Sequence, residues 1–140
     1  MGYKFEHLEV WQLVMEYLDL IYPIADKLPR SEEFNLKSQI VRAATSIQLN
    51  IAEGSTTQSN AEQTRFIVLA IRSLIETVAC QHQIHRRKFL NDPTPLREAY
   101  KFSEKLFAKL QAFRNALLHS GSVAREEQGL YEIGSGTPFG

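Results

Sequence analysis

The chain has 140 residues, of which 44% are hydrophobic and 23% are charged, and its formal net charge at pH 7 is zero. This length and composition are typical of one globular domain with a buried core. The longest apolar run, residues 66–71, is too short to span a membrane, and the first residues lack an apolar signal segment. With Cys80 as the only cysteine, no internal disulfide can form, which fits a reducing compartment. We therefore expect a cytoplasmic protein, and the short apolar runs predict no membrane segment.

Four segments with helical periodicity follow one another along the chain. The first is predicted over residues 7–28, where Pro23 predicts a kink and Pro29 ends the pattern. Its apolar stripe consists of Leu8, Trp11, Val14 or Met15, Leu18, Ile21 or Tyr22, Ala25 and Leu28. The second helix is predicted over residues 34–54, with Gly54 as its C-terminal stop.

The third helix is predicted over residues 60–90. Ser59 and Glu62 fit a capping box at its start. Its core stripe consists of Phe66, Ile67, Ala70, Ile71, Leu74 and Val78. Beyond Cys80 this stripe fades into polar and basic residues, so we expect the end of the helix to project past the core.

The fourth helix is predicted over residues 95–119, with Thr94 as N-cap and Pro95 at the first helical position. Its apolar seam consists of Leu96, Ala99 or Tyr100, Ser103, Leu106 or Phe107, Leu110, Phe113 and Leu117. Residues 120–140 carry five of the seven glycines and have no clear period. The sequence therefore predicts an all-α protein, an up-down-up-down antiparallel four-helix bundle over residues 1–119 with a flexible tail over residues 120–140.

A line of polar residues crosses the second predicted helix. Steps of three and four place them on one helix face: Gln39, Arg42, Ser46, Asn50 and Glu53. The favoured interpretation is a structural network, in which Arg42 pairs with Glu53 or Glu76 and fixes the register of the bundle. An oligomer interface is the second interpretation. A catalytic site is the least favoured, because Glu53 has no partner carboxylate at a motif spacing and no nucleophile lies beside a histidine.

Charge is distributed unevenly along the chain. Residues 1–64 hold 5 basic and 9 acidic side chains, whereas residues 65–119 hold 10 basic and 4 acidic ones. Basic residues recur every four positions along the fourth helix and form a ridge: Arg97, Lys101, Lys105 and Lys109. A basic cluster at the end of the third helix lies across the turn from Arg97 and consists of Arg86, Arg87 and Lys88. These residues are candidates for binding a phosphate backbone, and the alternative is a solvated helix face.

Further candidates lie on the third predicted helix. One face of this helix holds Arg65, Arg72, Glu76 and Arg87. It is interpreted equally well as a salt-bridged subunit interface and as a ligand site. His82 and His85 are close enough to share a metal. Bundles that bind two metal ions use paired Glu-x-x-His motifs, and the chain has no Glu three residues before a His, so we predict no metal and no cofactor.

Residues 39–54 resemble the signature of the four-helix-bundle proteins encoded in intervening sequences of bacterial 23S ribosomal RNA genes, also called S23 ribosomal proteins. The resemblance covers about residues 5–119. It is carried by Gln39-Ile40, Arg42-Ala43-Ala44, Ser46-Ile47 and Asn50-Ile51-Ala52-Glu53-Gly54, together with Leu8, Trp11-Gln12, Phe66, Ala70, Ser73 and Glu76. It implies ring-like homo-oligomers such as pentamers. It also implies kinship with the accessory variability proteins of diversity-generating retroelements, which bind nucleic acid and work with a reverse transcriptase.

Together these features predict a self-associating bundle without catalytic activity that acts as a nucleic-acid-binding accessory protein. RNA or DNA, and a reverse transcriptase or another protein, are the expected partners. The alternative is a protein–protein scaffold in which the basic half docks onto the acidic half of a neighbouring subunit.

Overall fold

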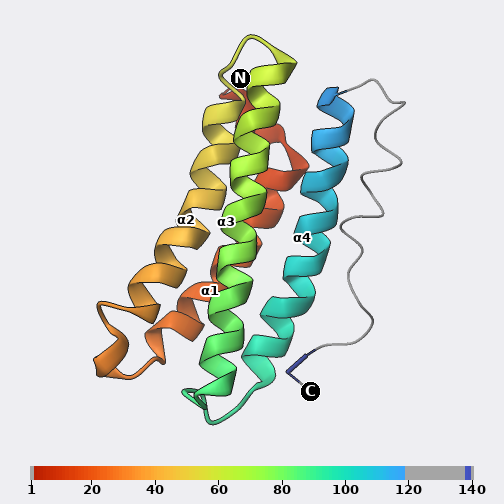
Figure 1. Ribbon diagram of the computed structural model, residues 1–140. Helices are drawn as coiled ribbons and strands as arrows, with labels where there is room; N and C mark the ends of the chain where they lie inside the picture. The colour runs from red at the N-terminus through yellow and green to blue at the C-terminus, as the bar shows by residue number, and fades with distance from the viewer. Residues whose placement is uncertain (1, 119–137, 140) are drawn as a thin grey trace.

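The computed structural model describes residues 2–118, 138 and 139. Four long helices, α1 (Glu9–Asp26), α2 (Leu36–Gly54), α3 (Asn60–Arg86) and α4 (Thr94–Leu118), are accompanied by two short 3-10 helices, η1 (Lys4–His7) and η2 (Arg30–Glu32). Successive long helices run in opposite directions (Figure 1), and both α1 and α3 pack against α2 and α4. The predicted antiparallel four-helix bundle is confirmed. No helix in the described part of the chain is long and apolar enough to cross a membrane.

The starts of α3 and α4 are both capped by side chains. Ser59 accepts the backbone N–H of Glu62 at 3.1 Å, which confirms the half of the predicted capping box that Ser59 supplies. The prediction that Thr94 caps α4 is wrong. Thr94 is the first helical residue, and its backbone N–H donates to Asp92 Oδ1 at 3.0 Å. This hydrogen bond lowers the pKa of Asp92, because it stabilises the charged carboxylate.

The end of α3 differs from the prediction by one helical turn. The helix ends at Arg86, and Lys88 follows in the left-handed conformation with φ of 56°. The backbone N–H groups of Lys88 and Phe89 donate to the carbonyls of His85 and Ile84, at 3.0 and 3.2 Å. This pair of bonds is the Schellman arrangement, which usually has glycine at the left-handed position.

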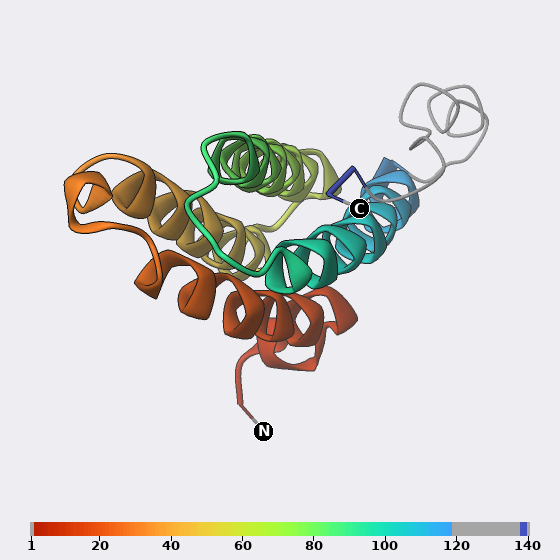
Figure 2. The same ribbon diagram turned by 90° about the horizontal axis from the view of Figure 1, so that it is seen from below.

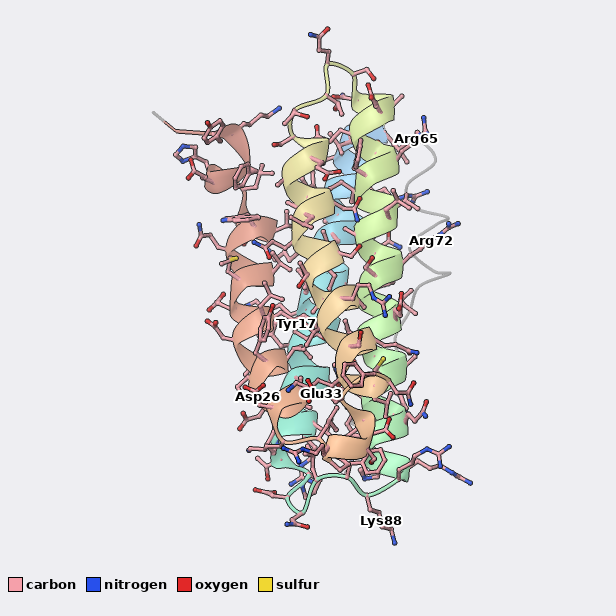
Figure 3. The ribbon with its side chains drawn as sticks, turned by 90° about the vertical axis from the view of Figure 1, so that its left-hand side faces the viewer. Tyr17, Asp26, Glu33, Arg65, Arg72 and Lys88 are labelled. Carbon is pink, nitrogen blue, oxygen red and sulfur yellow. The ribbon has the colours of Figure 1, made fainter. Side chains whose placement is uncertain are left out.

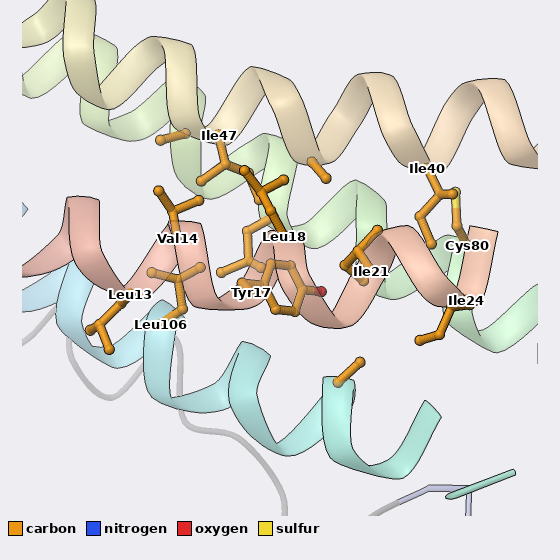
Figure 4. Packing of buried hydrophobic residues seen from close by; sticks show 14 of the residues in the cluster. Leu13, Val14, Tyr17, Leu18, Ile21, Ile24, Ile40, Ile47, Cys80 and Leu106 are labelled. Carbon is orange, nitrogen blue, oxygen red and sulfur yellow. The ribbon is translucent and has the colours of Figure 1, made fainter. Parts of the chain in front are cut away.

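The core is wider than a single apolar stripe on each helix. Because α1 packs against both α2 and α4, it buries Val10, Leu13, Val14, Tyr17, Leu18, Ile21, Ile24 and Ala25. Met15 and Tyr22, alternatives in the predicted stripe, are 40% and 44% exposed. Figure 4 shows Tyr17 in this core beside Leu18 and Ile21.

The C-terminal part of α3 does not project past the core, contrary to the prediction. Cys80, Gln81 and Ile84 are all buried. Burial also raises the pKa of the Cys80 thiol, because the apolar surroundings disfavour the thiolate.

A hydrogen-bonded network ties this part of α3 to α1. The hydroxyl groups of Tyr17 and Thr77 lie 2.8 Å apart, and Gln81 Nε2 donates to the Tyr17 hydroxyl at 2.8 Å. Thr77 Oγ1 also donates to the carbonyl of Leu74 at 2.6 Å. Burial raises the pKa of Tyr17 well above its ordinary value. This network, which the sequence pattern did not reveal, links α1 and α3 at one register.

Candidate nucleic-acid interface

The polar line of α2 is only partly involved in a network. Asn50 Nδ2 donates to the carbonyl and the hydroxyl of Ser46, at 2.8 and 3.1 Å. The Ser73 hydroxyl of α3 donates to the Ser46 hydroxyl at 2.9 Å. These three half-buried residues connect α2 to α3 at the surface of the bundle.

The charged members of this line are exposed. Within the described residues Arg42 makes no ion pair with Glu53 or Glu76, so the predicted Arg42 pairing is wrong. The outer side of the α2–α3 pair carries charges of both signs and two exposed leucines. We call it the α2–α3 outer face and define it by Gln39, Arg42, Leu49, Glu53, Arg65, Leu69, Arg72 and Glu76. Arg65 and Arg72 project from α3 away from the bundle (Figure 3).

The basic cluster predicted at the end of α3 lies at one end of the bundle. Arg86, Arg87 and Lys88 are all exposed, and Lys88 extends beyond the helices (Figure 3). The Schellman turn that positions Lys88 leads into α4, so Arg97 lies one turn into the next helix at the same end.

The basic residues of α4 wind around the helix and do not form a straight ridge. A step of four residues exceeds the helical repeat of 3.6, so each successive side chain rotates further around the axis. At one end Arg97 donates to the carbonyl of Phe139, and at the other Lys109 pairs with Glu9 of α1 at 3.4 Å. Between them Lys101 and Lys105 are exposed, with the Lys105 ammonium 5.6 Å from the ring centre of Phe102.

The two aromatic residues near these cations belong to the core. Phe102 stacks on Tyr17 of α1 with ring centres 6.1 Å apart, and Phe89 packs against the hydrophobic core. Core packing, which the sequence favoured over base stacking, is confirmed for both. Both rings are therefore engaged within the bundle.

The described residues contain no group of three or more His, Cys, Asp or Glu side chains that could hold a metal ion. His82 and His85 instead contact the ring of Phe139, with ring centres 5.0 and 5.1 Å apart.

A family model described as 23S rRNA-intervening sequence protein matches residues 6–112. The chain belongs to this family. The match begins in η1, spans α1 to α3 and includes most of α4, so every basic candidate from Arg86 to Lys109 lies within it. The search of curated proteins found no match to the chain. The family resemblance predicted from residues 39–54 is thereby confirmed.

Two features of the site were not predicted from the sequence. The Tyr17–Thr77–Gln81 network was missed because Tyr17 lies 60 and 64 residues from the other two members and no local pattern connects it to them. The burial of Phe139 was missed because residues 120–140 were predicted to be a flexible tail. Most of that segment lies outside the described residues, whereas Phe139 is 1% exposed.

Proposed function

We propose that the protein binds nucleic acid through the basic end of its bundle, formed by the end of α3 and the first half of α4. The basic end consists of Arg86, Arg87, Lys88, Arg97, Lys101 and Lys105. The observation that carries the proposal is that none of these six side chains makes an ion pair within the described residues. Cations without acidic partners are available to phosphate oxygens, and binding them releases counterions from the nucleic acid.

The backbone at Lys88 adds support. A left-handed conformation disfavours every residue with a Cβ atom, and glycine is the usual choice at this position of a helix end. A fully extended basic side chain in its place puts a positive charge at the tip of the bundle. The family description names 23S rRNA, so an RNA is the first ligand to test, with DNA as the other candidate.

A charge-reversal experiment tests the site. In the double variant Lys101→Glu/Lys105→Glu, both replaced side chains are exposed and neither forms an ion pair within the described residues, so the fold is expected to remain intact. Lys109 is left unchanged because it pairs with Glu9. Affinity for a single-stranded RNA should fall at least tenfold, and the slope of log affinity against log salt should decrease by about 1.4, or about 0.7 for each lost phosphate contact.

A matched control changes the net charge by the same amount at another surface. Lys4→Glu/Arg30→Glu alters exposed residues of η1 and η2, outside α3 and α4. This control should retain most of the RNA affinity. An equal loss in both double variants would show that only net charge matters and would refute the proposed site.

We further propose that the protein self-associates through the α2–α3 outer face. Leu49 and Leu69 are 51% and 45% exposed there, beside charges of both signs that have no ion-pair partner within the described residues. A second subunit can cover such a face, because the exposed leucines are then buried and the charges meet opposite charges. A ring such as a pentamer is the expected assembly.

The size of the assembly distinguishes this interface from a merely solvated surface. In multi-angle light scattering the chain of 16.0 kDa should elute as a multiple of that mass, and Leu49→Ser/Leu69→Ser should shift it toward the monomer. Ile75→Ser serves as the control, because Ile75 is 50% exposed on the same helix but lines the α3–α4 side. A monomeric wild-type chain at micromolar concentration would refute self-association.

The alternative function is a protein–protein scaffold. It is favoured by the same outer face, and its partner would be a protein such as a reverse transcriptase. In this case the Leu49 and Leu69 substitutions would abolish binding of the partner protein. The charge reversals on α4 would change no nucleic-acid affinity, because the protein would bind no nucleic acid. In either case we propose a cytoplasmic protein without catalytic activity.

A further inference from the structure

Phe139 is buried although it is the second-to-last residue of the chain. Its side chain is 1% exposed, and its ring packs against α3 and α4. The ring centre lies 5.0 Å from that of His82, 5.1 Å from His85 and 5.5 Å from Tyr100. Figure 2 shows this C-terminal end between α3 and α4. We call the enclosure formed by His82, His85, Arg97 and Tyr100 the tail seat.

The tail seat recognises the backbone as well as the ring. Arg97 Nη1 donates to the carbonyl oxygen of Phe139 at 3.0 Å, and Nη2 donates to Thr94 Oγ1 at 3.2 Å. The bond to Thr94 orients the guanidinium toward Phe139. An aromatic anchor in an enclosed site, together with a donor for a main-chain carbonyl, is the usual chemistry of short-peptide recognition.

Most of the tail seat is built from side chains that the bundle core does not use. His82 and His85 are exposed, while Arg97 and Tyr100 are only half-buried. His82 and Tyr100 contact each other edge to face, with ring centres 6.3 Å apart, so two walls of the seat support each other. The walls of the seat therefore lie at the surface of the bundle, while the Phe139 ring joins the hydrophobic core cluster.

We propose that the tail seat is a peptide-binding site whose ligand is the chain's own Pro138–Phe139 segment, and that its occupancy withholds Arg97 from phosphate. The second clause rests on the proposed nucleic-acid function. The helix α4 is about 37 Å long, at about 1.5 Å per residue. The 19 residues between Leu118 and Pro138 can span about 60 Å, so the connection can be made within one chain.

Competition at Arg97 follows from the position of the peptide beside its guanidinium. A guanidinium recognises phosphate best when two parallel N–H groups face the two oxygens. In the tail seat, donors on both terminal nitrogens are already used, one by the Phe139 carbonyl and one by Thr94. A phosphate that approaches Arg97 from the side occupied by Phe139 must displace the peptide carbonyl to reach Nη1.

Peptide binding to a chain with a vacant seat tests the proposal. The full-length variant Phe139→Ala should bind a fluorescent peptide of residues 135–140, measured by anisotropy, and a peptide with Ala in place of Phe should not bind. Wild type should bind the peptide at least tenfold more weakly, because its tethered tail competes at an effective concentration in the millimolar range. Adding His82→Ala/His85→Ala to Phe139→Ala should abolish binding, and circular dichroism would confirm that the bundle remains folded.

Several results would overturn the proposal. No peptide binding by Phe139→Ala would exclude the site, and equal binding by wild type would exclude its occupancy by the chain's own tail. A smaller assembly for Phe139→Ala than for wild type in light scattering would assign the seat to the tail of a second copy.

RNA binding tests the second clause separately. Phe139→Ala should bind single-stranded RNA about three- to tenfold more tightly than wild type, and Arg97→Ala should remove this gain. An unchanged RNA affinity would refute competition at Arg97. If neither chain binds RNA, the proposed function fails together with this clause, whereas the peptide titration still decides whether the tail seat binds the C-terminus.

Discussion

Gly54 lies where the last turn of α2 approaches the first turns of α3. A Cβ atom at this position would be 2.8 Å from the Cβ atom of Phe66, closer than real Cβ contacts allow. Since Phe66 Cβ is fixed to its backbone, the two helices would have to move apart. The sequence predicted Gly54 as a helix stop. The helix does end there, but the stronger constraint is this contact with a residue of the next helix.

Substitution of Gly54 by alanine should therefore destabilise the protein. Alanine gains about 1 kcal/mol of intrinsic helix preference over glycine, and overpacking costs about 1–3 kcal/mol, so we expect a net loss of about 1 kcal/mol in the free energy of unfolding. Urea denaturation measures it. Ala79→Gly on the exposed side of α3 measures the intrinsic preference alone. A stabilised Gly54→Ala variant would show that the helices do not approach this closely.

Tyr17 predicts a loss of stability at alkaline pH. In the unfolded chain its hydroxyl ionises near pH 10, whereas burial raises its pKa in the folded protein. Its contribution is complete below about pH 10 and falls as the pH rises toward the folded pKa, by at most about 1.4 kcal/mol per pH unit. Tyr17→Phe should cost about 1–3 kcal/mol at pH 8, because Gln81 loses its acceptor.

The same variant should also show a shallower decline in stability between pH 10 and 11 than wild type. Tyr22→Phe, at a 44% exposed position of α1, is the control and should leave the decline unchanged. Parallel curves for wild type and Tyr17→Phe in denaturant titrations would contradict the buried network.

At the scale of the elements, substitution of Lys88 by glycine at the end of α3 should affect stability and RNA affinity in opposite directions. Lys88→Gly should stabilise the protein by about 1 kcal/mol, because glycine adopts the left-handed conformation without the cost of a Cβ atom. The same substitution removes one cation from the basic end, so RNA affinity should fall severalfold. Lys88→Ala should lose the affinity without the gain in stability. Equal stability of the two variants would contradict the left-handed turn.

Element types followed from the sequence more readily than element ends. Apolar residues spaced three or four positions apart identified all four helices, and Ser59 marked the start of α3 correctly. The end of α3 was placed too late because the usual signal, glycine, is replaced by Lys88 within a basic run. The start of α4 was placed one residue late, with Thr94 as N-cap, because proline is common at the first helical position; the helix begins at Thr94, whose backbone N–H donates to Asp92.

At the scale of the whole molecule, the surface of the bundle carries two patches of different character. The α2–α3 outer face combines exposed leucines with charges of both signs, whereas the basic end carries unpaired charges of one sign. The sequence predicted the charged residues of both surfaces because charge and periodicity are local properties, but it did not predict the exposure of Leu49 and Leu69. It did not predict that Arg97 and Lys109 face different sides of α4, nor that Phe139 contacts Arg97, because these contacts depend on the assembled fold.

The salt dependence of RNA binding by the wild-type chain tests the central claim most directly. Filter binding of a single-stranded RNA should be measured between 50 and 200 mM salt, about the range over which phosphate contacts are sensitive. If four or more residues of the basic end contact phosphates, log affinity should fall linearly with log salt with a slope of about −3 or steeper. Absence of binding at the lowest salt concentration, or an affinity independent of salt, would contradict the account.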